Sequence, residues 1–269
     1  MRALAFALLL AVGLACEGCF QSKTLITVNG DGSGTLEQTL IFSGAALIQM
    51  RQVAPLAGGS SSSSKAFDPF SEEQARQAAA SLGPNVRYVS STAITTGEGL
   101  GRTAVYAFPD INQLRFNEQP PVPGGVTIRS KQLNTEQNIR FVLAPQPDGH
   151  VALRVLWPQP TAPARGGAPA AIRPSPEEIA TIKETFAGAR LSIAVKPSGE
   201  IVKTSSPWVE NGSVTLIDLQ FDQLAADEAA LARLPGVRSV EDAKIALSDV
   251  PGVKISTDRE ITIEFIPKK

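Results

Sequence analysis

Cysteine and histidine are the side chains that most often act as nucleophiles, proton carriers or soft metal ligands. This chain of 269 residues contains Cys16, Cys19 and His150 and no others of these two types. A cysteine–histidine pair or a serine–histidine–aspartate triad would need His150, and a zinc site with several soft ligands is excluded. Because His150 follows a Pro-Asp-Gly turn, we interpret it as a surface residue of a hairpin.

Carboxylates are the remaining candidates for catalysis. Adjacent acids occur at 72–73, 177–178 and 227–228 on expected helices, where they complement the helix dipole or lie on a solvated face. A glycosidase that uses carboxylates alone needs two acids about 5–10 Å apart in a cleft, and no pair is marked out for that role. We therefore predict a protein that is not an enzyme, with no catalytic residue, metal site or cofactor. A carboxylate-dependent exported hydrolase is the least favoured alternative.

The segment 29–34, Asn-Gly-Asp-Gly-Ser-Gly, shares its residue types with calcium and phosphate loops. A calcium loop takes several acidic ligands, whereas only Asp31 is present before Glu37. A phosphate loop leads into a helix, whereas the residues from Thr35 onwards alternate as in a strand. Asn-Gly and Asp-Gly are the dipeptides that tight hairpin turns require. The segment therefore predicts a hairpin.

The N-terminus has the pattern of an export signal. Arg2 is followed by the apolar stretch 3–14 and then by small residues. A helix needs about 20 apolar residues to cross a bilayer, so this stretch is too short to span one stably. Both cysteines lie at the end of the stretch and the body after them has none. A secreted protein held by disulfides would distribute its cysteines through the fold, so lipid attachment explains this placement better.

The residues 13–16, Gly-Leu-Ala-Cys, resemble the lipobox of bacterial lipoproteins, with glycine where leucine is usual. This resemblance implies a diacylglyceryl thioether on Cys16, often with an acylated amino group, and more than one acyl chain is what stable anchoring requires. Cys19 is the alternative, because Gly18 precedes it suitably but Glu17 does not. We expect a protein of the cell envelope, lipid-anchored to a membrane and facing the periplasm or the exterior.

The amino-acid composition is typical of a globular protein. Hydrophobic residues make up 43% of the chain, the net charge is −1 and the sequence pI is about 6.0. Nucleic-acid binding requires basic patches, and this charge balance gives no reason to expect them. The expected partners are therefore the membrane and an unknown envelope protein or lipid.

Alternation of apolar residues and the placement of turn residues divide the body into elements. The predicted strands are 23–28, 35–42, 86–95, 103–108, 126–130, 138–144, 150–157, 191–195, 200–204, 213–219, 253–256 and 260–266, the last two forming a hairpin. The predicted helices are 44–53, 71–82 with Ser71 as its N-cap, 175–187, 221–234 and 239–247. The segments 196–199 and 210–212 have the residues of tight turns. The predicted fold class is α+β, mainly antiparallel sheet with hairpin connections and several helices packed on it, preceded by the signal peptide.

Proline-rich and serine-rich stretches suggest the domain organisation. We expect a signal peptide over 1–15, an N-terminal lobe over 16–157, a proline-rich linker over 158–176 and a C-terminal lobe over 177–269. A flexible serine-rich loop at 57–65 falls within the first lobe. The alternative is a single sheet that crosses the linker.

Two stretches, 24–42 with its Gly-Asp-Gly-Ser-Gly turn and 191–219, resemble those of mycobacterial envelope lipoproteins of the LppM type. The resemblance covers about a third of the chain, implies an α+β envelope protein that touches lipid, and assigns no functional residue. Our first hypothesis is a lipid-anchored protein with a binding or scaffolding role. The alternative is a carrier of lipid or of a small hydrophobic ligand in a pocket between sheet and helices.

Overall fold

The computed structural model describes residues 20–44, 46–47, 70–96, 99–116, 138–158, 175–233, 247, 249–256 and 258–268. Several predictions concern residues outside this set: the signal peptide 1–15, Cys16, Cys19, the serine-rich loop 57–65, the strand 126–130 and most of the linker 158–176. Nearly all of the predicted helices 44–53 and 239–247 also lie outside it.

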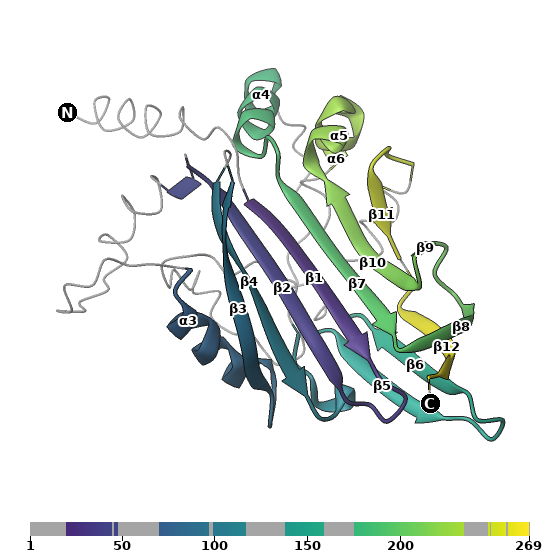
Figure 1. The fold of residues 1–269 in the computed structure, drawn as a ribbon. Helices are drawn as coiled ribbons and strands as arrows, with labels where there is room; N and C mark the ends of the chain where they lie inside the picture. The colour runs from purple at the N-terminus through teal and green to yellow at the C-terminus, as the bar shows by residue number, and fades with distance from the viewer. Residues whose placement is uncertain are drawn as a thin grey trace, which may run out of the picture.

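A large twisted sheet forms the centre of the fold (Figure 1). Its strands run in the order β11-β10-β7-β1-β2-β4-β3, and the short β9 pairs with β10. β1 and β7 are parallel, and every other pair within the sheet is antiparallel. The strands are β1 (Phe20–Val28), β2 (Gly34–Ser43), β3 (Arg87–Thr96), β4 (Gly99–Phe108), β7 (Arg190–Pro197), β9 (Val209–Glu210), β10 (Ser213–Gln220) and β11 (Val253–Ile255).

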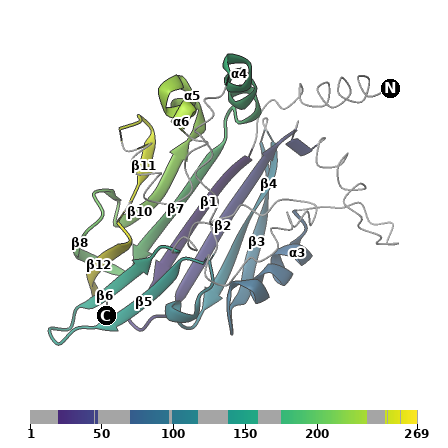
Figure 2. The same cartoon turned by 180° about the vertical axis from the view of Figure 1, so that it is seen from behind.

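A smaller antiparallel sheet has the order β5-β6-β12-β8. It lies across one face of the large sheet, over the end where β1 turns into β2 (Figures 1 and 2). Its strands are β5 (Arg140–Pro145), β6 (Val151–Leu156), β8 (Gly199–Thr204) and β12 (Glu260–Pro267). Alternate residues of β1 face it: Ile26 and Val28 are fully buried. They share one core cluster with Leu153 and Ile263 of the small sheet. Burial of these two facing layers is the main source of stability.

Both sheets combine strands from the two sides of the proline-rich segment, which corrects the predicted division into two lobes. β1 pairs with β7 from Gln21↔Arg190 to Val28↔Pro197. In the small sheet, β6 and β12 pair from Leu156↔Glu260 onwards. The observed strand pairs agree with the alternative expectation, a sheet whose strands come from both sides of the linker. A central strand needs a partner on each edge, and for β1 one of them is remote in the chain.

The two expected C-terminal strands exist, but they do not form a hairpin. β11 pairs with β10 in the large sheet and β12 pairs with β6 and β8 in the small one. The chain is fixed at Ser256 before it changes sheets. The Ser256 backbone N–H donates to the carbonyl of Leu216 (2.8 Å) and its hydroxyl donates to that of Thr215 (2.8 Å). Both acceptors lie at the β10 bulge, which leaves backbone groups free to hold the crossing.

The turn at Lys196–Gly199 also carries the chain between sheets and does not close a hairpin. β7 belongs to the large sheet and β8 to the small one. The Ser198 N–H donates to the carbonyl of Val28 (2.7 Å), and the Ser198 carbonyl accepts from Lys268 N–H (2.9 Å). The proline and glycine in this segment correctly indicate that the chain changes direction. They do not specify which strand β8 pairs with after the turn.

Two predicted hairpin turns are confirmed. β1 and β2 pair along their whole length, from Phe20↔Phe42 to Val28↔Gly34. β9 and β10 are joined at Asn211 and Gly212, which have φ of 52° and 72°. Positive φ at both central positions is what a type I′ hairpin turn requires, and Asn-Gly is its preferred sequence.

The described helices are shorter than expected, and the sheet dominates the fold. They are α3 (Glu72–Ala78), continued by a 3₁₀ turn at Ala79–Leu82, α4 (Pro176–Thr185), α5 (Phe221–Ala226) and α6 (Glu228–Arg233). The predicted N-cap Ser71 accepts a hydrogen bond from the Gln74 N–H (3.2 Å). The single helix expected over 221–234 is broken at Asp227, whose extended backbone ends α5. The α+β, mainly antiparallel class therefore holds, with less helix than the prediction.

Candidate functional site

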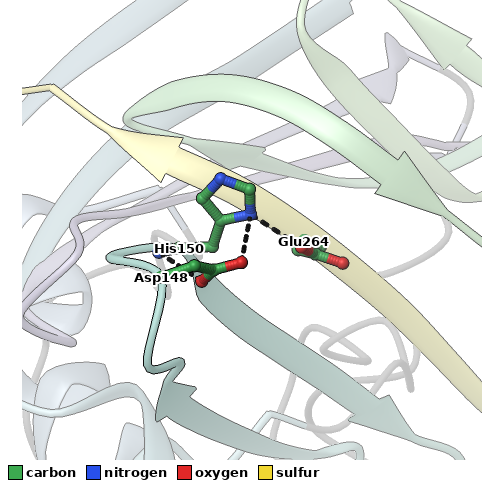
Figure 3. A group of neighbouring side chains, drawn as sticks. All are labelled: Asp148, His150 and Glu264. Atoms are coloured by element: carbon green, nitrogen blue, oxygen red, sulfur yellow. Dashed lines mark hydrogen bonds and ion pairs between the residues drawn. The ribbon is translucent and has the colours of Figure 1, made fainter.

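The structure gives His150 two acidic neighbours, and we consider this group, Asp148, His150 and Glu264, as the first candidate site (Figure 3). The imidazole Nδ1 lies 2.7 Å from Glu264 Oε1 and 3.3 Å from Asp148 Oδ2. Because both neighbours are acceptors, Nδ1 carries the proton and donates it. The side chains of His150 and Glu264 are 24% and 30% exposed, and that of Asp148 is 59% exposed. The group is therefore half-buried at the protein surface.

Local and long-range structure together build this group. Asp148 lies in the β5–β6 turn, where its Oδ1 accepts the His150 backbone N–H (3.0 Å), an arrangement that aspartate favours in turns. Glu264 comes from β12, the strand hydrogen-bonded to β6, where it pairs with Ala152. The prediction that His150 lies on a hairpin is correct. Its contact with Glu264 was not predicted, because the sequence indicated β11 as the neighbour of β12.

The hydrogen bond from Nδ1 to Glu264 raises the pKa of His150 above 6.5, and the charges of Asp148 and Glu264 act in the same direction against desolvation. A histidine with a raised pKa holds its proton more tightly when folded. The protonated imidazole links the β5–β6 turn to β12 through charge-assisted hydrogen bonds. The group can therefore work as a proton-dependent clamp between these two segments.

A metal ion would require a different arrangement of the same three side chains. One imidazole nitrogen and two carboxylate oxygens lie within 4.8 Å of one another, and zinc accepts such ligands. Ligand atoms about 2.0 Å from a tetrahedral zinc lie about 3.3 Å from each other. The Nδ1–Asp148 distance of 3.3 Å fits this value, but the Nδ1–Glu264 distance of 2.7 Å is that of a hydrogen bond. The observed geometry favours the proton.

An open groove of about 430 Å³ lies on the other face of the large sheet. Thr27, Thr35, Ala107 and Arg87 are successive cross-strand neighbours and form its floor and side. Thr27 alternates with the buried Ile26 and Val28, so it points away from the core. The hydroxyl groups and the guanidinium suit a polar or anionic group, and the lining also includes the apolar residues Phe108 and Pro109.

Three of the adjacent carboxylates, Glu72, Asp227 and Glu228, have structural contacts. Glu72 forms an ion pair with Arg76 (2.5 Å), and the hydrogen bond from Arg76, with one from Tyr88, lowers the pKa of Glu72. Glu228 pairs with Lys183 (2.9 Å). Asp227 accepts the Ala230 N–H at the start of α6 (3.0 Å).

Of the other described acids, Asp148 and Glu264 are brought together, and they share the contact with His150. Among the described acidic side chains, the pKa is displaced at Asp31, Glu72 and Asp110, and at each of them it is lowered. A general acid active at neutral pH needs the opposite shift. Cys16, Cys19 and Glu178 lie outside the side chains that the structure describes.

Comparisons with known proteins add little. No family model matches the chain, and no curated protein matches it. Among solved structures, the folded domain of LppM from Mycobacterium tuberculosis is similar at a TM-score of 0.33 and 12% identity, covering 94% of this chain and 93% of that one. An M1 zinc metallopeptidase from Deinococcus radiodurans gives a TM-score of 0.24 and 11% identity over 77% of this chain and 40% of its own. Both TM-scores are too low to carry an argument about fold or function.

No helix within the described residues combines the length and the apolar character needed to span a bilayer.

Proposed function

We propose that this protein is an exported lipoprotein, anchored to an envelope membrane through Cys16, whose body has a non-enzymatic binding or scaffolding role. One observation carries the proposal: the two cysteines of the chain lie between the apolar segment and Phe20, where β1 begins. A lipidated cysteine stands at the N-terminus of the mature chain, so this boundary suits an anchor joined directly to a folded body.

The body supports a binding or scaffolding role more than a catalytic one. Within the described residues, Glu72 and Glu228 form ion pairs and Asp227 caps α6. The displaced carboxylate pKa values, those of Asp31, Glu72 and Asp110, are all lowered.

The groove on the outer face is open, and its lining combines the hydroxyl groups of Thr27 and Thr35 with apolar residues such as Phe108. An open surface of this kind suits contact with a partner. Catalysis by carboxylates requires instead a closed environment that shifts the pKa of an acid.

One observation favours the alternative, a carrier of a lipid or small hydrophobic ligand. Ser22 and Thr24 are 5% and 2% exposed and lie on the same face of β1 as Ile26. Neither hydroxyl has a side-chain hydrogen bond within the described part of the chain. Buried polar groups normally have a partner, and a bound ligand would supply one. Extraction of the purified chain with organic solvent, followed by mass spectrometry, would reveal a co-purified lipid.

The anchor is tested by expressing the full chain and its variants Cys16→Ser and Cys19→Ser in a bacterium that processes lipoproteins. We expect the mature chain to begin at a diacylglyceryl-modified Cys16, Cys16→Ser to leave the membrane fraction, and Cys19→Ser to remain in it. The reverse pattern would assign the anchor to Cys19. Membrane association of both variants and of the double variant, with unmodified cysteines, would overturn the proposal.

A further inference from the structure

The end of the large sheet where β1 begins carries apolar side chains in a row. Phe20 is the cross-strand partner of Phe42, and Phe42 is the partner of Leu100. The rings of Phe20 and Phe42 have centroids 6.2 Å apart, and Phe70 lies 5.6 Å from Phe42. Three neighbouring strands therefore present large apolar groups at one end.

Part of this row is open to solvent. The side chain of Leu100 is 40% exposed. Phe186, which directly follows α4, is 39% exposed. α4 leads into β7, whose Arg190 pairs with Gln21 of β1, so Phe186 belongs to the same end. Figure 1 shows α4 and the start of β1 together at the top of the sheet. We call Phe20, Phe42, Phe70, Leu100 and Phe186 the anchor-side end.

The tether to this end is short whichever cysteine carries the lipid. Four residue steps separate Cys16 from Phe20 and one step separates Cys19 from it. At most about 3.6 Å per step, the longer tether reaches about 14 Å. β1 has nine residues and is about 26 Å long at about 3.3 Å per residue interval. The anchor therefore holds the Phe20 end of the sheet next to the bilayer, and the opposite end lies a strand length away.

We propose that the anchor-side end rests on the lipid bilayer, with Leu100 and Phe186 entering its interface, so that the body has a fixed orientation on the membrane. This inference depends on the proposed lipid anchor. A bilayer is the occupant that fits, because the chain before Phe20 leads there and because partly exposed aromatic and aliphatic side chains partition into its interface. The net charge is −1 for the whole chain and −2 (−1 − 1) once the signal with Arg2 is removed, which indicates that apolar contact, more than attraction to anionic lipids, holds this end in place.

The molecule supplies a matched control. Ile266 of β12 is 44% exposed, close to the 40% of Leu100. It is followed by Pro267, which lies beside Gly30 of the β1–β2 turn, at the far end of β1. If exposure alone decided contact with lipid, Ile266 and Leu100 would behave alike. If the anchor decides it, only Leu100 and Phe186 would meet the bilayer.

The test is quenching of tryptophan fluorescence by lipids with brominated acyl chains. The full lipidated chain and its variants Leu100→Trp, Phe186→Trp and Ile266→Trp are reconstituted into vesicles of phosphatidylethanolamine and phosphatidylglycerol, with and without bromine. The emission of the unsubstituted chain, from Trp157 and Trp208, is subtracted. Because an interfacial side chain sits about 5–10 Å into the headgroup and acyl boundary, we expect about half of the added emission to be lost for Leu100→Trp and Phe186→Trp. We expect no loss for Ile266→Trp.

Equal quenching at all three positions, or at none, would overturn the inference. Flotation of the same vesicles separates this result from failure of the anchor. A chain that floats with the vesicles while Leu100→Trp and Phe186→Trp remain unquenched keeps its anchor but lacks the orientation. A chain with unmodified cysteines that does not float overturns both proposals. Thermal unfolding of each variant verifies that the body is folded before quenching is interpreted.

Discussion

The anchor-side end of the large sheet and its opposite end are closed by different physical means. At the anchor-side end, Phe20, Phe42 and Phe70 pack ring against ring. At the opposite end, which we call the distal end, the turns 29–34, 110–113 and 146–150 are closed by side chains that bind their own backbone. The first arrangement depends on burial and is insensitive to pH, whereas the second depends on charge and local geometry.

Carboxylates dominate the distal turns. Hydrogen bonds from the Ser33 hydroxyl and then the Ser33 N–H lower the pKa of Asp31. Partial burial alone would raise the pKa of Asp110, but hydrogen bonds from Gln113 and Asn112 together lower it. Ionised side chains of this kind belong in water, whereas the anchor-side end offers rings to a less polar neighbour. The two ends therefore suit different surroundings, which is what an oriented protein at a membrane surface needs.

The largest expected effect comes from removing a ring at the anchor-side end. Phe42 is 6% exposed and contacts Phe20 and Phe70. We expect Phe42→Ala to lower the free energy of unfolding by about 3–5 kcal/mol, because the cavity adds to the lost transfer energy. Leu100→Ala, at an exposed position of the same row, is the control and should cost much less. Urea titration measures both, and equal losses would show that the row is not packed as described.

The next largest effect concerns the distal end of β2. Gly34 opens β2, and a Cβ there would collide with the carbonyl of Thr27 and the ring of Phe108. We expect Gly34→Ala to cost about 1–3 kcal/mol through overpacking. The control is Gly44, directly after the other end of β2, where a Cβ meets nothing within 4 Å. Gly44→Ala should leave the urea midpoint unchanged or raise it, since alanine restricts the unfolded chain, and a loss as large as that of Gly34→Ala would contradict the comparison.

A smaller effect tests how α3 is attached beside the aromatic cluster. Phe70 precedes Ser71, whose hydroxyl accepts the Gln74 N–H at the start of α3. We expect Ser71→Ala to destabilise the protein by about 1 kcal/mol, because an N-terminal backbone donor loses its partner. Ser71→Asp should restore the wild-type melting temperature, since aspartate caps equally well. A loss for both variants would mean that Ser71 contributes through packing.

The smallest effect distinguishes the distal end by its pH dependence. Since folding raises the pKa of His150 above 6.5, its contribution to stability is complete below about pH 6.5 and is lost as pH rises through the folded pKa. The chain has one histidine, so its imidazole signals in an NMR titration report this pKa directly. We expect a value above 6.5 that falls towards 6.5 in Glu264→Gln. A pKa at or below 6.5 in the unsubstituted chain would contradict the clamp.

Elements that depend on neighbouring residues could be predicted from the sequence. The 29–34 turn, the Asn211–Gly212 turn and the Ser71 cap each need only the residues beside them, and all three are present. The partner of β12 could not be predicted in this way. The turn residues near 257–259 indicate a reversal, but the β10 bulge that holds Ser256 is formed by long-range pairing. A short hairpin and a crossing between sheets therefore look alike in the sequence.

The candidate site likewise combines a contact that the sequence could predict with one that it could not. Asp148 and His150 are two residues apart in a turn, so their contact is local. Glu264 joins them only because β12 lies beside β6, and nothing near Glu264 in the sequence indicates this. The apolar row at the anchor-side end is similar. Phe20, Phe42 and Leu100 meet because β1, β2 and β4 have the observed register, which a single sequence does not specify.

The parallel pairing of β1 with β7 has a consequence for how the chain folds. β2 directly follows β1 in the chain, so their hairpin is a local contact, whereas the partner of the other edge of β1 is the remote segment Arg190–Pro197. Contacts between such distant segments slow folding, and an unpaired strand edge promotes aggregation in the meantime. A chain that crosses a membrane N-terminus first would leave this edge open for most of its passage. Folding of the body should therefore be rate-limited by arrival of the second half of the chain, and a chaperone that covers open strand edges would help it most before that point.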